Sequence, residues 1–359
     1  MFHAIKNQNG EFPEAGSLTL ARADWPLAGG GAPPAATIRE RCEDFRVIEA
    51  PLLEPSGEGE HLWVWIRKTD WTTAAVGDCL ARWAGVERRG IGWAGRKDRK
   101  AVTEQWFSIH LPGRTDPDVD CVWPAGIELL ALRRHDRKLR AGMLAGNRFL
   151  LRVRHLRGER EEVERRLEKI REEGAPNYFG PQRFGRRGDN MRQACQFLLG
   201  GKRIRGRALR STLISAARSW IFNELLAARV RDGSWRRPVR GDVLMLEGSH
   251  SVFRCEAVDE TILARAASGD LRVTGPLPGD GGMLSDAPVE REVLQAWDDL
   301  VGALAARRVK ADRRPLSVTP RDLELRWLDD ESFELSFELP PGAYATSILR
   351  ELVTFEQNI

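Results

Sequence analysis

The sequence contains few of the side chains that build metal centres or disulfide frameworks. Its 359 residues include five cysteines, an odd number at widely spaced positions, and six scattered histidines. The cysteine spacing argues against a disulfide framework and against a Cys-x-x-Cys metal site, and the histidines lack the spacing of zinc ligands. We therefore expect no metal ion, and the reducing cytoplasm is the simplest location.

Long apolar runs and a large excess of charge are also absent. No apolar stretch approaches the ~20 residues that span a bilayer, and residues 1–16 are polar and interrupted by glycine and proline. We therefore expect a soluble protein without a membrane segment. The net charge is only +4, from 56 basic and 52 acidic residues, so a nucleic-acid surface would have to come from local clusters. Such clusters occur at 96–100, 133–140, 183–187 and 202–210.

Length and hydrophobic periodicity predict two domains with mixed α and β structure. The composition changes at 173–176, which marks a hinge between them. Before the hinge, strands are predicted at 61–67, 105–111, 126–132 and 148–154, and helices at 72–83 and 161–171.

The chain after the hinge continues this mixed pattern. It predicts helices at 191–199 and 211–231, a strand near 242–247, and one long amphipathic helix through 293–304. Residues 323–339 alternate between apolar and polar side chains and predict a hairpin of two antiparallel strands.

The most informative segment is GRKDRKAVTEQ at 95–105, where Asp98 is a lone carboxylate among four cations. Apolar runs on both sides predict strands, so Asp98 is expected on an exposed loop, where catalytic groups are commonly held. The cations favour the ionised carboxylate and could hold phosphates beside a reacting nucleotide. An ionised carboxylate suits a nucleophile better than a general acid. The alternative is a solvated loop with an ordinary ion pair.

Three segments together resemble one enzyme family. Residues 95–105 resemble the signature segment of the TruD family of tRNA pseudouridine synthases, PNYFGPQRFG at 176–185 resembles its second hallmark, and PGAYATSILREL at 341–352 resembles its C-terminal motif. Similar order and spacing extend from about residue 37 to about residue 355. Three motifs in the right order are a far stronger signal than one short pattern.

The resemblance implies an α+β fold with two domains. A catalytic domain of the pseudouridine synthase type, with a mixed and mainly antiparallel sheet, would be discontinuous and comprise residues 1–173 and 316–359. An inserted α/β domain of the TRUD type, residues 174–315, would form the other wall of an RNA-binding cleft. The motif order agrees, because the Asp98 motif precedes the insertion and the Tyr344 motif follows it.

The resemblance further implies a tRNA pseudouridine synthase that acts on uridine 13. Pseudouridine formation cuts the bond between N1 and C1′, turns the uracil and rejoins the ribose through C5, so no atoms are gained or lost. We therefore expect no cofactor and no metal. Asp98 would be the catalytic residue, either by attacking C1′ or by removing the C2′ proton. The expected partner is tRNA, and the expected state is a monomer.

Four residues could contact a flipped uracil. Tyr344 is the candidate for stacking, at a position where relatives often carry Phe; the alternative is a half-buried tyrosine at a strand end. Asn147 and Phe149 match a smaller family element and could contact the edge and face of uracil, although the residues alone read as a turn asparagine and a core phenylalanine. Phe45 matches a ligand-pocket position, and a strand-core role is its alternative.

Six cations complete the predicted site. Arg39 stands where relatives commonly have Lys and would lie near the carboxylate or a phosphate. Lys97 adjoins Asp98, and Arg350 is a second candidate partner for that carboxylate, with a surface salt bridge as the alternative. Arg183 and the arginines at 186 and 187 are expected to contact phosphate. The aromatic residues of the same segment are expected to pack between the domains: Tyr178, Phe179 and Phe184.

A catalytically silent RNA-binding or RNA-chaperone protein with the same fold is the main alternative. The intact Asp98 favours the enzyme, because a silent relative would be expected to lose that carboxylate first. A phosphate-binding loop at 95–97 is disfavoured, since glycines are too few and a predicted strand, rather than a helix N-terminus, follows.

Overall fold

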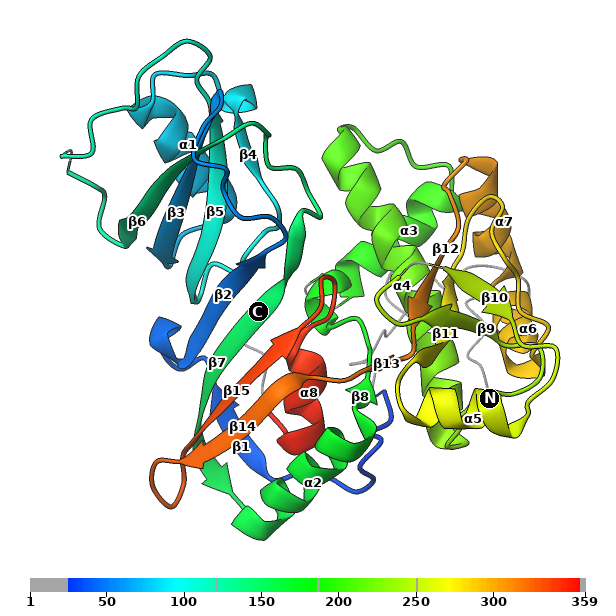
Figure 1. The fold of residues 1–359 in the computed structure, drawn as a ribbon. Helices are drawn as coiled ribbons and strands as arrows, with labels where there is room; N and C mark the ends of the chain where they lie inside the picture. Colours follow the sequence, from blue (N-terminus) through cyan, green and yellow to red (C-terminus); the bar gives the residue numbers. More distant parts are fainter. Residues whose placement is uncertain (1–24, 121, 186–187, 250, 356–359) are drawn as a thin grey trace.

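The computed structural model describes residues 25–120, 122–185, 188–249 and 251–355. It has two parts (Figure 1): a large sheet with helices on one side, and a group of helices around a smaller sheet. Within the described ranges, no helix is both long and apolar enough to cross a membrane.

The first part is built on a nine-stranded sheet with the order β14, β15, β7, β2, β5, β3 and β6, to which β1 adds beside β7 and β4 beside β5. Its described pairings are antiparallel except that of β2 with β5. The expected mixed, mainly antiparallel sheet is therefore present. Its strands are β1 (Ala35–Ile38), β2 (Phe45–Pro51), β3 (His61–Thr69), β4 (Ile91–Trp93), β5 (Val102–His110), β6 (Ile127–His135), β7 (Leu144–Arg157), β14 (Arg321–Trp327) and β15 (Phe333–Leu339).

One face of this sheet is apolar and covered by helices. Val47 of β2 pairs with Thr103 of β5 and with Phe149 of β7, so these three side chains share that face. Three helices pack on it: α1 (Thr73–Trp83), α2 (Arg160–Glu173) and α8 (Ala345–Leu352). Helix α1 begins where the sequence predicts, because Thr72 Oγ1 accepts a hydrogen bond from the Ala75 amide at 3.1 Å. Short 3-10 turns lie at η1 (Cys42–Asp44) and η2 (Arg88–Gly90).

The second part has its own hydrophobic core around the long helix α4 (Arg207–Arg231). Phe222 and Leu226 of α4 pack with Leu244 and Val273 of a four-stranded antiparallel sheet. The strands of this sheet are β9 (Val243–Leu246), β10 (Val252–Arg254), β11 (Leu271–Leu277) and β12 (Asp312–Pro315). The other elements are η3 (Pro181–Arg183), α3 (Asp189–Leu198), α5 (Glu260–Ala267), α6 (Pro288–Ala296) and α7 (Asp298–Ala306).

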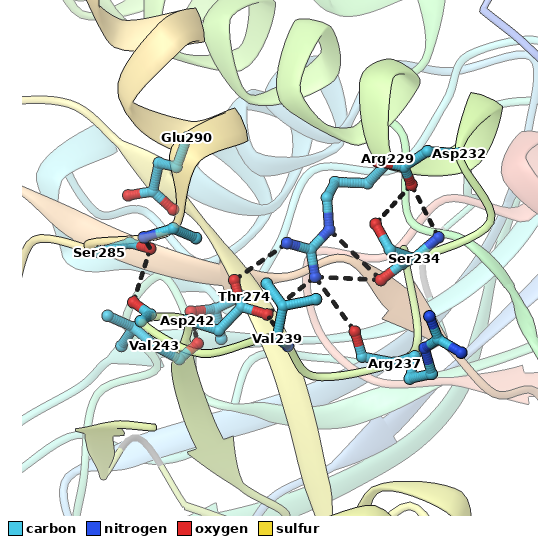
Figure 2. A network of polar contacts seen from close by, with 12 residues as sticks. Arg229, Asp232, Ser234, Arg237, Val239, Asp242, Val243, Thr274, Ser285 and Glu290 are labelled. Atoms are coloured by element: carbon cyan, nitrogen blue, oxygen red, sulfur yellow. Dashed lines mark hydrogen bonds and ion pairs between the residues drawn. The ribbon is translucent and has the colours of Figure 1, made fainter. Parts of the chain in front are cut away.

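Buried ion pairs tie the helices of this part to its sheet. Arg229 reaches from the end of α4 to Asp242, with 2.8 Å between Nη2 and Oδ2, and also donates to the main-chain oxygen of Ser234 (Figure 2). Arg313 of β12 pairs in the same way with Glu290 of α6 at 2.6 Å. All four charged side chains are at most 6% exposed. Removing one partner would leave a buried charge, so these pairs fix how the helices sit on the sheet.

The chain passes between the two parts at two neighbouring segments, which form a neck. Strand β8 (Ala175–Pro176) leaves the first part and pairs with β13 (Ser317–Val318), which returns to it. Beside this pair, the Asn177 amide donates to the Leu316 oxygen at 2.8 Å. These contacts lie at the expected boundaries, and they support our proposal that residues 174–315 are an insertion into a domain formed by 1–173 and 316–359.

The structure confirms the predicted hairpin and corrects one helix. Strands β14 and β15 pair antiparallel within 321–339. The single long helix expected through 293–304 is wrong, because α6 ends at Ala296 and α7 begins at Asp298. Trp297 breaks the helix with φ −116° and ψ 21°. Its buried indole packs edge-on against Trp220, with ring centroids 6.5 Å apart, and we attribute the break to this packing.

Candidate active site

Asp98 lies on the loop between β4 and β5, as the sequence predicts. Its Oδ2 accepts a hydrogen bond from Nη2 of Arg39 at 2.6 Å, and its side chain remains 39% exposed. Among the described residues, Arg39 is the only ion-pair partner of this carboxylate. Asp98 is therefore oriented by one cation and still open to a substrate.

Arg39 is held in an unusual conformation. Its φ is 56°, in the left-handed region where a residue other than glycine is strained by about 1 kcal/mol or more. Its guanidinium carbon lies 3.7 Å from the centroid of the Phe45 ring, a cation–π contact. The ring below and the carboxylate beside it fix the position of the guanidinium.

Lys97 and Arg99, next to Asp98 in the sequence, pair with other carboxylates, Glu49 and Asp70. Lys97 turns inward, and its Nζ donates to Glu49 Oε2 and to Asn147 Oδ1, each at 2.7 Å. The side chains of Lys97 and Glu49 are only 5% and 2% exposed, and burial raises the pKa of Glu49. Lys97 therefore supports the loop from beneath instead of facing a phosphate in this structure.

Lys68, near the end of β3, is a site residue that the sequence interpretation missed. Its Nζ donates to the main-chain oxygen of Asp98 at 2.6 Å, and the residue is fully buried. Burial lowers the pKa of Lys68 to about 8, and Lys97 acts in the same direction while the Asp98 charge opposes it. The signal was present in β3, where Lys68 occupies the next inward position after three apolar ones: Leu62, Val64 and Ile66.

Two further polar residues fasten the loop. The Lys97 amide donates to Thr73 Oγ1 at 2.9 Å, and Gln105 Nε2 donates to the Gly95 oxygen at 3.0 Å. Thr73 Oγ1 in turn donates to Gln105 Oε1 at 3.1 Å. Thr73 and Gln105 are buried, so the last residue of the 95–105 motif acts on the backbone of the first.

The two phenylalanines predicted to contact uracil are both buried. Phe149 is 7% exposed and stacks on Phe337 with centroids 5.3 Å apart, and Phe45 is 3% exposed and meets Phe149 edge-on at 6.3 Å. Both rings therefore match the core alternative, and Phe45 also lies directly under Arg39.

Tyr344, the residue before α8, contacts the second part of the structure. Its hydroxyl accepts a hydrogen bond from Arg183 Nη2, and its ring meets Phe179 edge-on with centroids 6.0 Å apart. Arg183 also donates through Nη1 to Ser215 Oγ of α4 at 3.0 Å. The guanidinium of Arg183 thus joins α4 to the loop that carries Tyr344.

The expectation that Arg350 pairs with Asp98 is wrong. Arg350 donates to the main-chain oxygens of Trp25 and Pro26 and lies 4.8 Å above the Tyr178 ring. Helix α8 turns its buried apolar residues toward the sheet, and position 350 consequently faces the segment at 25–26.

The sheet register links the Asp98 loop, through Asn147, to the strand that leads to the C-terminal motif. Asn147 of β7 pairs with Glu49 of β2 and with Leu339 of β15, and the chain reaches Tyr344 soon after Leu339. Ser347 Oγ then donates to the Tyr178 oxygen at 2.8 Å, which joins the C-terminal motif to the hinge motif. The three aromatic residues Tyr178, Phe179 and Phe184 are buried, but Phe184 packs edge-on against Trp220 in the core of the second part, so packing of all three between the domains stays a prediction.

Comparison with known proteins gives one consistent family. The model of the family described as tRNA pseudouridine synthase D (TruD) matches residues 31–203 and 205–352. This chain belongs to the TruD family. Among its relatives, tRNA pseudouridine synthase D of Aeromonas salmonicida is 45% identical over 332 residues, which covers 91% of this chain and 93% of the relative. That of Hydrogenovibrio crunogenus is 41% identical over 336 residues, covering 93% and 97%.

A crystal structure of TruD from Methanosarcina mazei shares the fold. It superposes with a TM-score of 0.68 and 23% identity, and covers 91% of this chain and 95% of that one. The α+β architecture expected from the resemblance is thereby confirmed.

The ranges matched by the TruD model contain every candidate residue discussed above. Arg186 and Arg187, expected to contact phosphate, lie outside the described residues. Within the described ranges, no group of three or more His, Cys, Asp or Glu side chains could hold a metal ion.

Proposed function

We propose that this protein isomerises uridine to pseudouridine in tRNA, at position 13, and that Asp98 acts on the ribose. The observation that carries the proposal is the setting of Asp98: an open carboxylate, oriented by one guanidinium, on a loop fastened by buried polar side chains. Such a preorganised group needs little rearrangement when the reaction occurs. The names of the relatives, each a tRNA pseudouridine synthase D, support the substrate.

In the proposed reaction, the bond between N1 and C1′ breaks, the uracil turns while bound, and a bond forms between C5 and C1′. C5 loses a proton and N1 gains one, so the product is an isomer. Asp98 either attacks C1′ and forms a covalent adduct, or removes the C2′ proton. In both routes, Arg39 sets the direction of the carboxylate and Lys68 sets the position of its backbone.

The target uracil has to leave the RNA stack to reach Asp98. We propose that the Tyr344 ring supplies a stacking face, held by the hydrogen bond from Arg183. Asn147 Oδ1 accepts a hydrogen bond from Lys97 Nζ, so the Nδ2 group of Asn147 remains available to donate to a uracil carbonyl. Phe45 and Phe149 form the floor beneath Arg39 and Asn147, and contribute shape rather than stacking.

The insertion would form the second wall of the RNA-binding site. Arg183 contacts Tyr344 across the two parts, so an RNA that reaches both Asp98 and Tyr344 would also contact the insertion. We further propose that the protein works as a monomer in the cytoplasm. Light scattering of the purified protein at micromolar concentration would test the monomer.

The proposal is tested with tRNA that carries tritium at uracil C5. We expect the native protein to release tritium, and Asp98→Asn to release it at least about 1000-fold more slowly with tRNA binding largely kept. Asp70→Asn makes the same chemical change in a nearby exposed carboxylate, which pairs with Arg99 at 3.0 Å, and should remain active. A tRNA with cytidine at position 13 should release nothing.

Two outcomes would count against the proposal. Equal release by native protein and Asp98→Asn would remove Asp98 from the mechanism. No release from either protein, together with retained tRNA binding, would favour the catalytically silent RNA-binding protein.

A further inference from the structure

A hollow of about 740 Å³ lies in the insertion, where α3, α4 and α7 come together. Its lining includes four arginines, Arg207, Arg210, Arg218 and Arg307, and the hydroxyl of Ser215. No carboxylate is found among its described lining residues. The elements concerned are grouped in the helical part of Figure 1.

Concentrated positive charge distinguishes this hollow from a larger one of about 860 Å³ on the uncovered face of the nine-stranded sheet. That second hollow also contains arginines, but carboxylates lie among them. Arg154 there pairs with Asp44 at 2.8 Å, and Arg152 pairs with Glu334 at 2.7 Å. Four carboxylates therefore lie among its arginines, whereas the described lining of the α3, α4 and α7 hollow contains none.

The hydrogen-bond partners of Arg218 and Arg307 are neutral main-chain oxygens, and outside the lining the charge of Asp312 also acts on Arg218. Arg218 donates to the main-chain oxygens of Leu277 at 2.8 Å and Lys310 at 3.1 Å, and Arg307 donates to that of Phe197 at 2.9 Å. Burial lowers the pKa of Arg218, and its buried Nε has no partner among the described residues. The side chains of Arg207 and Arg210 are exposed and make no hydrogen bond or ion pair within the described ranges.

The start of α4 adds to this positive potential. The helix begins at Arg207, its N-cap is Gly206 without a side-chain cap, and its first turn has no acidic residue. A helix N-terminus carries free amide donors and the positive end of the helix dipole, so cations there are unfavourable and anions are favourable. Two arginines in the first turn of a helix of 25 residues are therefore unfavourable unless an anion binds between them.

The hollow is connected to Tyr344 through one side chain. Ser215 lines the hollow and accepts a hydrogen bond from Arg183 at 3.0 Å, and the same guanidinium reaches the hydroxyl of Tyr344. An extended polyanion in the hollow could therefore continue toward the tyrosine proposed to stack on uracil.

We propose that this hollow is a phosphate-binding subsite that holds the RNA backbone beside the target uridine. Arg207 and Arg210 supply charge to phosphodiester oxygens, while Arg218 and Arg307, fixed by main-chain oxygens, shape the floor. The identity of the RNA as tRNA rests on the proposed function. The preference of the hollow for phosphate rests only on its own charges.

The test compares the double variant Arg207→Met/Arg210→Met with Arg291→Met, which removes an exposed arginine on α6 outside the hollow. Affinity for unmodified tRNA is measured between about 50 and 200 mM salt, and tritium release is measured at saturating tRNA. We expect the double variant to bind tRNA about 10-fold to 100-fold more weakly at low salt. The slope of log affinity against log salt should become less steep by about 1 to 2. Its kcat should stay within about 3-fold of the native value.

Two controls separate phosphate binding from a structural role. Arg207→Lys/Arg210→Lys keeps both charges and should recover most of the affinity. Removing cations from a helix N-terminus should leave the Tm unchanged or raise it, whereas a structural role would lower it. An unchanged salt slope in the Met variant, with native protein that binds and modifies tRNA, would overturn the subsite. If the native protein binds tRNA without releasing tritium and the Met variant still loses salt-dependent affinity, the subsite stands and the proposed function fails.

Discussion

Lys68 is expected to lower the stability of the fold while it supports catalysis. The residue is fully buried, and burial lowers its pKa from 10.5 to about 8. This difference of about 2.5 pH units corresponds to about 3 kcal/mol against the charged form at neutral pH. Lys68→Met keeps a similar length and removes both the charge and the hydrogen bond to the Asp98 oxygen.

The sign of the pH dependence follows from the proton balance. Between about pH 8 and 10.5 the unfolded chain keeps the Lys68 proton while the folded chain has released it, so the native protein gains stability as pH rises through this window. Lys68→Met lacks this gain. With about 1 kcal/mol for the lost hydrogen bond, we expect the variant to be more stable than the native protein by about 1 to 2 kcal/mol at pH 7. Between pH 7 and pH 10, the free energy of unfolding of the native protein should rise by about 2 to 3 kcal/mol relative to that of the variant.

Thermal unfolding at several pH values measures this difference, and tritium release measures turnover. We expect kcat of Lys68→Met to fall at least about 10-fold, because the Asp98 backbone loses its anchor and small displacements of a catalytic group are costly. Lys169→Met is the matched control, since Lys169 also donates to a main-chain oxygen, that of Ala28 at 2.9 Å. It should show neither effect. A difference in stability that does not depend on pH would refute the role assigned to burial, and normal turnover would refute the anchoring role.

Three further changes test other contacts of the site. Arg39→Met should lower kcat about 100-fold, because it removes the ion-pair partner of the Asp98 carboxylate. Arg39→Lys should keep most activity. Comparable losses of activity in both variants would show that the positive charge does not explain the role of Arg39. Tyr344→Phe should lower kcat/KM for tritium release about 5-fold, because only the hydrogen bond from Arg183 is lost. Tyr344→Ala should lower kcat/KM far more. Equal effects of the two substitutions would exclude a role for the aromatic ring. Glu49→Gln should lower the free energy of unfolding by about 3 kcal/mol, measured in urea, because it leaves the buried ammonium of Lys97 without a counter-charge. A change below about 1 kcal/mol would mean that water reaches this ion pair.

Local patterns predicted the parts of the site that depend on nearby residues. The loop that carries Asp98 follows from the apolar runs on either side of it, and the final hairpin follows from alternation of apolar and polar residues. The order of three motifs predicted the family and, through it, the architecture. Each of these features is encoded within a few residues or in linear order.

Contacts between distant residues were harder to predict. Arg183 and Tyr344 are 161 positions apart, and only the packing of the insertion brings them together. The direction of Arg350 depends on which face of α8 meets the segment at 25–26, and helical spacing alone does not set this. Lys68 could have been found, because a charged residue at an inward strand position needs a buried partner.

The neck has a consequence for the order in which the chain folds. Strand β7 pairs with β15, so Val153 must find Phe333 across 180 positions. Closing a loop of that length is entropically expensive while residues 174–315 are unfolded. Once the insertion has folded, β8 and β13 lie side by side, and its two ends are neighbours. The effective loop then shrinks from 180 to roughly 40 residues, which removes about 1.4 kcal/mol of closure entropy. We therefore expect an early-folding insertion to act as a clip that speeds completion of the catalytic sheet.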